Sequence, residues 1–199
     1  MNPKLCFIDT ETTGTDVNVH GLIQVAGILT TWDPTTRLFT ELERFDLRMK
    51  PFPADRVEAS ALAVNGVTEE QLAELPAPGN QYRALVALLG KHISKFNRLD
   101  KAWFVGYNAR FDSDFIRRWF EKCGDVYYGS WFWYPPIDVT NLAAIRFLQN
   151  RQTLPNFKLS TVADALGIKP EGELHDAMTD IKLTQAIFTK LLNPPEAAQ

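Results

Sequence analysis

The stretch FIDTETTG at residues 7–14 places two carboxylates at the end of an otherwise apolar run. Extended back to Lys4, this run has the composition of a buried β-strand that is interrupted by Asp9 and Glu11. Side chains two positions apart on a strand share a face, so the two carboxylates are expected to lie side by side. A half-buried pair of like charges repels itself and loses hydration. One member should therefore bind a proton, or the pair should bind a cation.

The rest of the chain predicts further strands. Apolar and β-branched runs at 21–33 and 37–47, joined through the turn residues 33–36, predict an antiparallel meander with the first strand. A fully apolar run at 102–108 predicts one more buried strand. Segment 126–139 is rich in aromatic residues and is expected to be irregular or an edge strand.

Helices are predicted where apolar residues recur at helical spacing or where capping residues begin or end such a pattern. These segments are 54–64, 68–75, 82–96, 111–124, 140–150, 158–168 and 176–192, and the segment 76–80 is expected to be a turn. Strands come first along the chain, and helices follow with one strand between them. This order predicts an α/β fold in which helices cover a mixed sheet.

Length and composition define the class of protein. The 199 residues, 45% of them hydrophobic, predict a single domain over residues 1–192 with a flexible tail at 193–199. No apolar run is long enough to cross a bilayer, and Asp9 interrupts the apolar start, so a cytoplasmic protein is expected. Cys6 and Cys123 are expected to be buried, reduced thiols.

Two further acidic residues fall on the apolar faces of predicted helices. Asp112 lies three and four residues before the apolar stripe of helix 111–124, where an N-cap or first-turn role is the alternative. Asp180 lies four residues before Thr184 on the inner stripe of the last helix. It is predicted to be mid-helix, and a buried ion pair is its alternative. His175 is expected in the loop before that helix, where it can reach the same site.

Carboxylates that converge without a cluster of Cys or His side chains suit hard cations such as Mg²⁺ or Mn²⁺. Two such ions can activate a water molecule and stabilise the leaving oxygen of a phosphodiester. They would also reverse the sign of the net charge of −3, which by itself argues against binding to nucleic acid. A histidine beside such a site can accept the proton of the attacking water, because its pKa lies near neutrality.

Three short motifs resemble those of the DEDDh branch of the DnaQ-like 3′–5′ exonucleases: DTETTG at 9–14, NARFD at 108–112 and HDAMTD at 175–180. They occur in the family's order, and the resemblance extends over nearly the whole chain, from Phe7 to about Phe188. It implies a ribonuclease H-like fold, in which helices flank a mixed five-stranded sheet. It also implies the roles of five residues: Asp9, Glu11, Asp112 and Asp180 as ligands of two Mg²⁺ or Mn²⁺ ions, and His175 as the general base.

The same resemblance implies how the substrate end is held. In this family the turn after the first two carboxylates contacts the terminal nucleotide and its 3′-hydroxyl, which implies substrate-binding roles for Thr12, Thr13 and Gly14. Asn108, the first residue of the second motif, is also expected to bind the substrate. Free N–H groups in such a turn would recognise a chain end, which favours an exonuclease over an endonuclease. The residues of the second and third motifs resemble those of the exonuclease I type. That implies single-stranded DNA as the favoured partner and nucleoside 5′-monophosphates as products.

Three positions carry residues that differ from those common in the family, and these differences leave the class of substrate open. Gln24 stands where Glu is frequent, and Asn65 and Tyr107 stand where His is frequent. Two alternatives stay open. One is an RNA-trimming 3′–5′ exoribonuclease or oligoribonuclease. The other is a proofreading or repair-complex subunit that acts mainly by binding another protein.

The aromatic segment 127–134 has three interpretations. It can fill the core, form an interface with a protein partner or a second copy of the chain, or stack on unpaired bases. Asp138 lies between the motifs and is expected to be structural, since two ions need only the four carboxylates, water and substrate. His20 and His92 are given no functional role.

Overall fold

The structure, a computed structural model, describes residues 2–170 and 177–193. Its centre is a five-stranded sheet in the order β3-β2-β1-β4-β5. β1 pairs antiparallel with β2 and parallel with β4, β2 pairs antiparallel with β3, and β4 pairs parallel with β5. The predicted mixed sheet of five strands is confirmed. The strands are β1 (Lys4–Thr12), β2 (Leu22–Trp32), β3 (Phe39–Arg48), β4 (Ala102–Gly106) and β5 (Ile137–Asp138).

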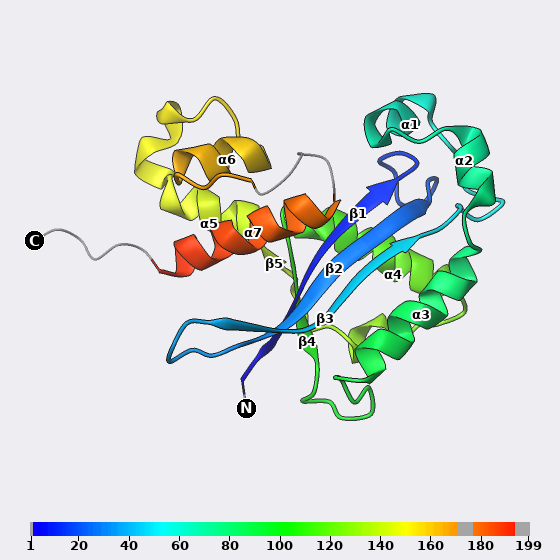
Figure 1. Cartoon of the computed structure of the whole chain (residues 1–199), viewed down its shortest axis with the longest axis horizontal. Coiled ribbons are helices and arrows are strands. Elements are labelled where there is room, and N and C mark those ends of the chain that lie inside the picture. The colour runs from blue at the N-terminus through cyan, green and yellow to red at the C-terminus, as the bar shows by residue number, and fades with distance from the viewer. Residues whose placement is uncertain (1, 171–176, 194–199) are drawn as a thin grey trace, which may run out of the picture.

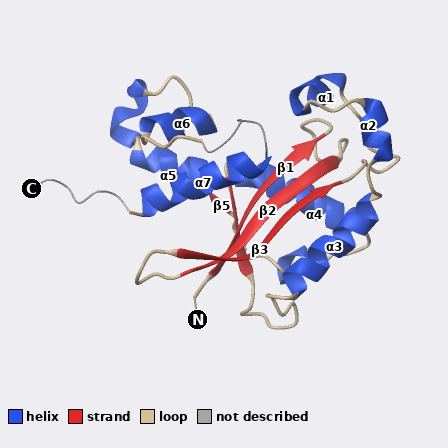
Figure 2. Ribbon diagram, viewed as in Figure 1, coloured by secondary structure: helices blue, strands red, loops and turns tan. Residues whose placement is uncertain are grey.

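Helices cover both faces of the sheet, as the ribbons show (Figures 1 and 2). Alternate side chains of β1 enter different cores, because successive residues of a strand point to opposite faces. Cys6 and Ile8 pack with α3 (Pro78–Gly90) and α4 (Ala109–Lys122). Leu5 and Phe7 pack on the other face, against three helices: α5 (Val139–Arg146), α6 (Leu159–Ala165) and α7 (Ala177–Leu192).

Two short helices lie near the carboxyl end of β1: α1 (Ala59–Asn65) and α2 (Glu69–Glu74). A third, small apolar cluster of Ile23, Leu62 and Leu72 attaches both helices to β2. The predicted helix start at Thr68 is confirmed, because its side chain accepts from the N–H of Gln71 while the Gln71 side chain accepts from the N–H of Thr68. Two 3₁₀ turns, Tyr128–Ser130 and Leu148–Thr153, complete the described elements.

Some predicted helix limits are wrong. The helix predicted at 82–96 is α3, which begins at Pro78 and ends at Gly90, so the expected turn at 76–80 is partly helical. Proline is favoured in the first turn, where its missing N–H has no helical partner. The chain leaves the helix before Phe96, and the side chain of Phe96 is 89% exposed. The helix predicted at 140–150 ends at Arg146.

Three large side chains of the aromatic segment 127–134 lie inside the protein. Tyr128, Trp131 and Phe132 are at most 5% exposed and belong to the core that α3 and α4 form on the sheet. Only Tyr127 and Tyr134 are exposed among the large side chains at its two ends. The core interpretation is confirmed for these three side chains, and an interface or base stacking through the other residues of the segment stays a prediction.

Asn193, the last described residue, accepts a hydrogen bond of 2.9 Å from Arg37, in the turn between β2 and β3. The single domain predicted over residues 1–192 and the tail predicted at 193–199 stay predictions. Residues 194–199 lie outside the described residues. No helix of the described ranges has both the length and the apolar character required to cross a membrane.

Candidate active site

The carboxyl end of β1 brings the first pair of acidic side chains together. Asp9 and Glu11 are half-buried and share a face, while Thr10 between them is buried on the opposite face. Strand β1 is regular up to Glu11, and its pairing with β2 shifts between Glu11 and Thr12. The acidic pair therefore stands where the strand ends and the following turn begins.

Asp112 reaches this end of β1 from the first turn of α4. It is 4% exposed, and one of its carboxylate oxygens accepts two hydrogen bonds from Thr10: 3.1 Å from the backbone N–H and 2.7 Å from the hydroxyl. The expectation that Asp112 lies on the buried side of its helix is confirmed. The neighbouring Ser113 is also buried, and its hydroxyl lies 3.0 Å from the hydroxyl of Tyr128.

Electrostatics links the acidic groups to one another. Burial raises the pKa of Glu11 to about 7, and repulsion by Asp180 contributes to the shift. Burial also raises the pKa of Asp112 well above its ordinary range, and repulsion by Glu11 adds to this, while the hydrogen bonds from Thr10 act in the opposite direction. Glu11 thus interacts with acidic groups from both α4 and α7, which lie on opposite faces of the sheet.

The described part of the last motif lies on α7. Asp180 is in the first turn of the described helix, Ala177–Leu192. A first-turn acidic residue is compatible with the helix dipole, so position alone does not mark Asp180 as a ligand. Its electrostatic interaction with Glu11 is the stronger indication. His175 falls in 171–176, outside the described residues.

The acidic groups fit a hard divalent cation in their chemistry. They offer only oxygen ligands, and two of them have pKa values raised by burial and by acidic neighbours, a repulsion that a bound cation would relieve. Within the described part of the chain, no group of three or more His, Cys, Asp and Glu side chains is arranged so that it could hold a metal ion. The described carboxylates interact in pairs, Glu11 with Asp180 and Glu11 with Asp112.

The turn after Glu11 is held mainly by internal hydrogen bonds. Thr13 is fully buried: its hydroxyl donates to the carbonyl of Arg56 (2.6 Å), and its backbone N–H donates to the carbonyl of Gly21 (2.9 Å). The expectation of free N–H groups is therefore wrong at Thr13. A Cβ added at Gly14 would lie 2.4 Å from the ring of His20, so glycine is required there by packing. Direct contact of Thr12, Thr13 and Gly14 with a substrate stays a prediction.

Asn108 begins α4 in a left-handed conformation, with φ of 65°. Asparagine tolerates this conformation better than most residues. Its backbone N–H lies 3.1 Å from both the Asp138 carboxylate and the Thr140 hydroxyl, and its side chain is exposed. Asp138 also caps α5, accepting from the N–H of Thr140 (2.9 Å). The structural role expected of Asp138 agrees with these contacts, and substrate binding by Asn108 stays a prediction.

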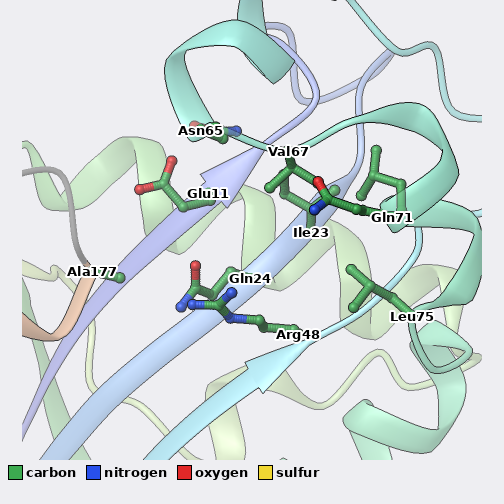
Figure 3. A pocket seen from close by; sticks show the side chains of 11 residues that line it. Glu11, Ile23, Gln24, Arg48, Asn65, Val67, Gln71, Leu75 and Ala177 are labelled. Atoms are coloured by element: carbon green, nitrogen blue, oxygen red, sulfur yellow. The ribbon is translucent and has the colours of Figure 1, made fainter.

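A pocket of about 320 Å³ opens beside Glu11 (Figure 3). Its apolar walls come from β2 and from the segment around α2, and they consist of Ile23, Val67, Leu72 and Leu75. Its polar side chains are Glu11, Gln24, Arg48, Asn65 and Gln71, and Ala177 at the start of α7 completes the wall near the carboxylates. The volume lies at the lower end of the range for small-ligand sites, roughly 300–1,000 Å³.

Several residues of this region could not be predicted from the sequence. Thr10 donates two hydrogen bonds to Asp112, and the only sequence feature that pointed to it was its position between two acidic residues. Arg48 and Gln71 line the pocket, but each sits in an unremarkable amphipathic pattern. The alignment of β3 beside β2 determines where Arg48 lies, and local sequence does not encode that alignment.

Comparison with known proteins identifies the family. The sequence profile of the RNase T family, described as Exonuclease, matches residues 6–188. A DNA polymerase III subunit epsilon-like protein of Rhodobacter capsulatus is 30% identical over 193 residues, which cover 95% of this chain but 24% of that protein. Ribonuclease T of Hahella chejuensis is 24% identical over 188 residues, which cover 94% of this chain and 82% of the relative.

Solved structures agree on the fold. A structure of exonuclease I matches with a TM-score of 0.75 and 22% identity, covering 98% of this chain and 41% of that chain. E. coli exonuclease I, solved in complex with a dT13 oligonucleotide, matches with a TM-score of 0.71 and 22% identity, covering 94% of this chain and 41% of that one. The chain therefore spans less than half the length of exonuclease I. With a family profile that matches most of its length, the chain belongs to the RNase T family of DnaQ-like 3′–5′ exonucleases.

Proposed function

We propose that this protein is a metal-dependent exonuclease that removes nucleotides from the 3′ end of single-stranded DNA and releases nucleoside 5′-monophosphates. One observation carries the proposal: Glu11 interacts with carboxylates from two other elements, Asp112 and Asp180, at the edge of a pocket of about 320 Å³. A bound cation would favour the ionised form of such carboxylates, because it offsets the repulsion between them. The pocket offers room for one terminal nucleoside beside them.

The proposed metal ligands are the four acidic residues of the motifs: Asp9, Glu11, Asp112 and Asp180. When bound, Mg²⁺ or Mn²⁺ supplies the positive charge that activates a water molecule and stabilises the leaving oxygen. Thr10 orients the carboxylate of Asp112 through its two hydrogen bonds. His175, in the segment before α7, accepts the proton of the attacking water.

The pocket beside Glu11 is the proposed site of the terminal nucleoside. Its apolar walls suit a flat base, and Ala177 and Glu11 at its other side place the last phosphodiester against the carboxylates. Thr12 and Asn108 lie on the segments that adjoin the acidic residues: Thr12 is the last residue of β1, and Asn108 directly precedes α4. Their proposed role is to contact the sugar and phosphate of the substrate end.

Matched DNA and RNA oligonucleotides, labelled at the 5′ end and incubated with Mg²⁺ or Mn²⁺, test polarity and substrate together. We expect a ladder of products shortened from the 3′ end, faster decay of single-stranded DNA than of RNA, and no cleavage in EDTA. Equal or faster decay of RNA would overturn the preference for DNA. Intact oligonucleotides of both kinds, after long incubation with folded protein and metal, would contradict the nuclease activity itself.

Variants separate the proposed roles. Asp9→Ala and Asp180→Ala should abolish cleavage, whereas Asp114→Ala, on the half-exposed side of α4, should retain it. His175→Ala should lower turnover by about 10²–10⁴-fold while Mn²⁺ binding, measured by calorimetry, remains. If His175→Ala and Asp180→Ala lost metal affinity equally, the division into ligands and base would be refuted.

Two relatives support the alternative functions. Similarity to Ribonuclease T, which extends over 82% of that relative, favours RNA trimming as the second candidate. Similarity to a DNA polymerase III subunit epsilon-like protein favours a subunit that binds a polymerase or repair protein. A partner surface on the aromatic segment would have to use Tyr127 and Tyr134, because these side chains are exposed. Capture of a partner that is lost in Tyr127→Ser and Tyr134→Ser would favour this alternative.

A further inference from the structure

The polar side chains of the pocket beside Glu11 differ in how far they are already engaged. Its three amide side chains already make hydrogen bonds to other groups of the protein. Gln24 donates to Asp46 (2.7 Å), Asn65 donates to the carbonyl of Thr12 (3.0 Å), and Gln71 accepts from the N–H of Thr68 (2.8 Å). Each amide is therefore fixed in orientation, and each has lost part of its capacity to bind a ligand. They form the frame of the pocket.

Arg48 is held much more loosely. Its side chain is 56% exposed, and its ion pair in the described structure is a long one, 3.9 Å from Nε to Asp46. An exposed pair at this distance contributes little, since solvent screens it. Asp46 is also already bound to Gln24. The guanidinium of Arg48 thus keeps most of its N–H donors for a ligand in the pocket that it lines (Figure 3).

The position of Arg48 indicates which part of a nucleotide it would meet. Glu11 pairs with Gln24 across β1 and β2, and Gln24 pairs with Arg48 across β2 and β3. Directly paired residues share one face, so these three side chains form a row across three adjacent strands. Two strand spacings place the backbone of Arg48 about 10 Å from that of Glu11. With the last phosphodiester at Glu11, the far end of this row corresponds to the base.

We propose that Arg48 selects the base of the 3′-terminal nucleotide and favours guanine over adenine, an inference that rests on the nuclease function proposed above. Arginine carries only donors, arranged in a rigid fork. Guanine presents two adjacent acceptors, O6 and N7, whereas adenine presents the N7 acceptor beside an amino donor. The two purines have the same shape and fill the apolar walls equally, so the guanidinium is the group that distinguishes them.

The test compares oligonucleotides that are identical except for a terminal guanosine, adenosine or inosine, measuring the rate of the first cleavage at subsaturating substrate with Mg²⁺. We expect removal of terminal guanosine about 5–10-fold faster than removal of adenosine, the lower part of the range for a bidentate contact at an exposed site. Inosine keeps O6 and N7 but lacks the 2-amino group, so it should behave like guanosine. Inosine that behaves like adenosine would exclude recognition through O6 and N7.

Two variants assign the preference to the side chain. Arg48→Met keeps the apolar stem but removes every donor, so it should bring the guanosine-to-adenosine ratio close to one. Arg48→Lys keeps donors that can reach O6 and N7 but loses the fork, so it should keep a reduced preference. A wild-type ratio of one would overturn the proposal, as would a full preference retained in Arg48→Met. An equal loss of rate on every base with an unchanged ratio would instead indicate a phosphate contact. Failure of the nuclease function is distinguishable, because then no terminal nucleotide of any kind is released.

Discussion

Asp112 has two properties that surface carboxylates do not share. It is 4% exposed, and one of its oxygens is fixed by both the backbone and the hydroxyl of Thr10. Burial of a charged carboxylate is unfavourable, and repulsion by Glu11 adds to that cost. A group maintained under such conditions is better explained by chemistry than by packing.

We expect Asp112→Asn to reduce activity and increase stability. The amide keeps an oxygen that can accept from Thr10 but removes the buried charge, so in EDTA near pH 8 the melting temperature should rise by roughly 2–12 °C, which corresponds to about 1–3 kcal/mol at this chain length. Cleavage with Mg²⁺ should fall by at least about 100-fold, because a metal ligand is lost. Calorimetry and the oligonucleotide assay measure the two effects.

Asp114→Asn is the matched control for this change. It alters a neighbouring acidic residue on the same helix, which is half-exposed and lies 3.5 Å from Arg110. It should change neither the melting temperature nor the cleavage rate appreciably. A lower melting temperature for Asp112→Asn than for the parent protein would show that the charge itself stabilises the fold.

The raised pKa values also predict how the metal-free protein responds to pH. A carboxyl group whose pKa is raised by folding favours the folded state while protonated, and this contribution is lost as the pH rises through the folded pKa. For Glu11 that value is about 7, and the shift of Asp112 has the same direction. In EDTA, the melting temperature should therefore fall between about pH 5.5 and pH 8.

Other carboxyl groups do not cancel this trend. The pKa values of four of them are lowered in the folded state, so their stabilising contribution is complete above the unfolded pKa and constant over this window: Asp33, Glu43, Glu70 and Asp100. Saturating Mg²⁺ should reduce the fall, because a bound cation favours the ionised groups. A melting temperature in EDTA that is flat or rising over the window would argue against this electrostatic account.

At the scale of elements, short segments shape the site as much as the sheet does. α2 has six residues, too few to be stable by itself, and depends on its capping box and on Leu72 in the small apolar cluster. The same helix contributes Gln71 to the polar lining of the pocket. A local device of helix initiation therefore supports the site proposed for the terminal nucleoside.

We expect Thr68→Ala to weaken substrate binding through α2. Loss of the cap should lower the free energy of unfolding by about 1 kcal/mol. It also removes the hydroxyl that accepts from the N–H of Gln71, and so loosens one wall of the pocket. KM for oligonucleotides should rise while kcat changes less, because the carboxylates lie on other elements.

Thr68→Ser provides the comparison, since serine keeps the capping hydroxyl. It should restore both stability and KM to near the parent values. If Thr68→Ala lowered kcat and left KM unchanged, α2 would not form part of the substrate site.

At the scale of the whole molecule, the two thiols report on the folded state. Cys6 is fully buried at the centre of β1, and burial raises its pKa; burial also raises the pKa of Cys123 to about 11. Near pH 8 the thiolate fraction of both is very small. With a disulfide reagent, folded protein should show one slow thiol and one unreactive thiol, whereas protein in guanidinium should show two fast ones.

In the variant Cys123→Ser, the rate of reaction with the disulfide reagent measures global unfolding. Its remaining thiol, Cys6, should react only at the rate at which the sheet opens. Rapid reaction of Cys6 in folded protein would contradict the packing of β1 between its two cores.

The sequence alone determined the mixed α/β fold, the three acidic motifs, the capping box at Thr68 and the burial of Asp112. Each of these follows from local spacing, because period and capping chemistry are written in neighbouring residues. It extended the helix predicted at 82–96 beyond the end of α3 at Gly90, since periodicity marks a face but not where the helix begins or ends. Element ends depend on competing local signals, such as the proline at the start of α3.

Only the tertiary structure decided the pocket and the row from Glu11 through Gln24 to Arg48. It also decided that Trp131 is core and that the N–H of Thr13 is used internally. These facts depend on strand register and on helices packed from opposite faces of the sheet, which join residues far apart in sequence. A one-residue change of register would turn Arg48 to the other face, and no local pattern in β3 encodes that choice.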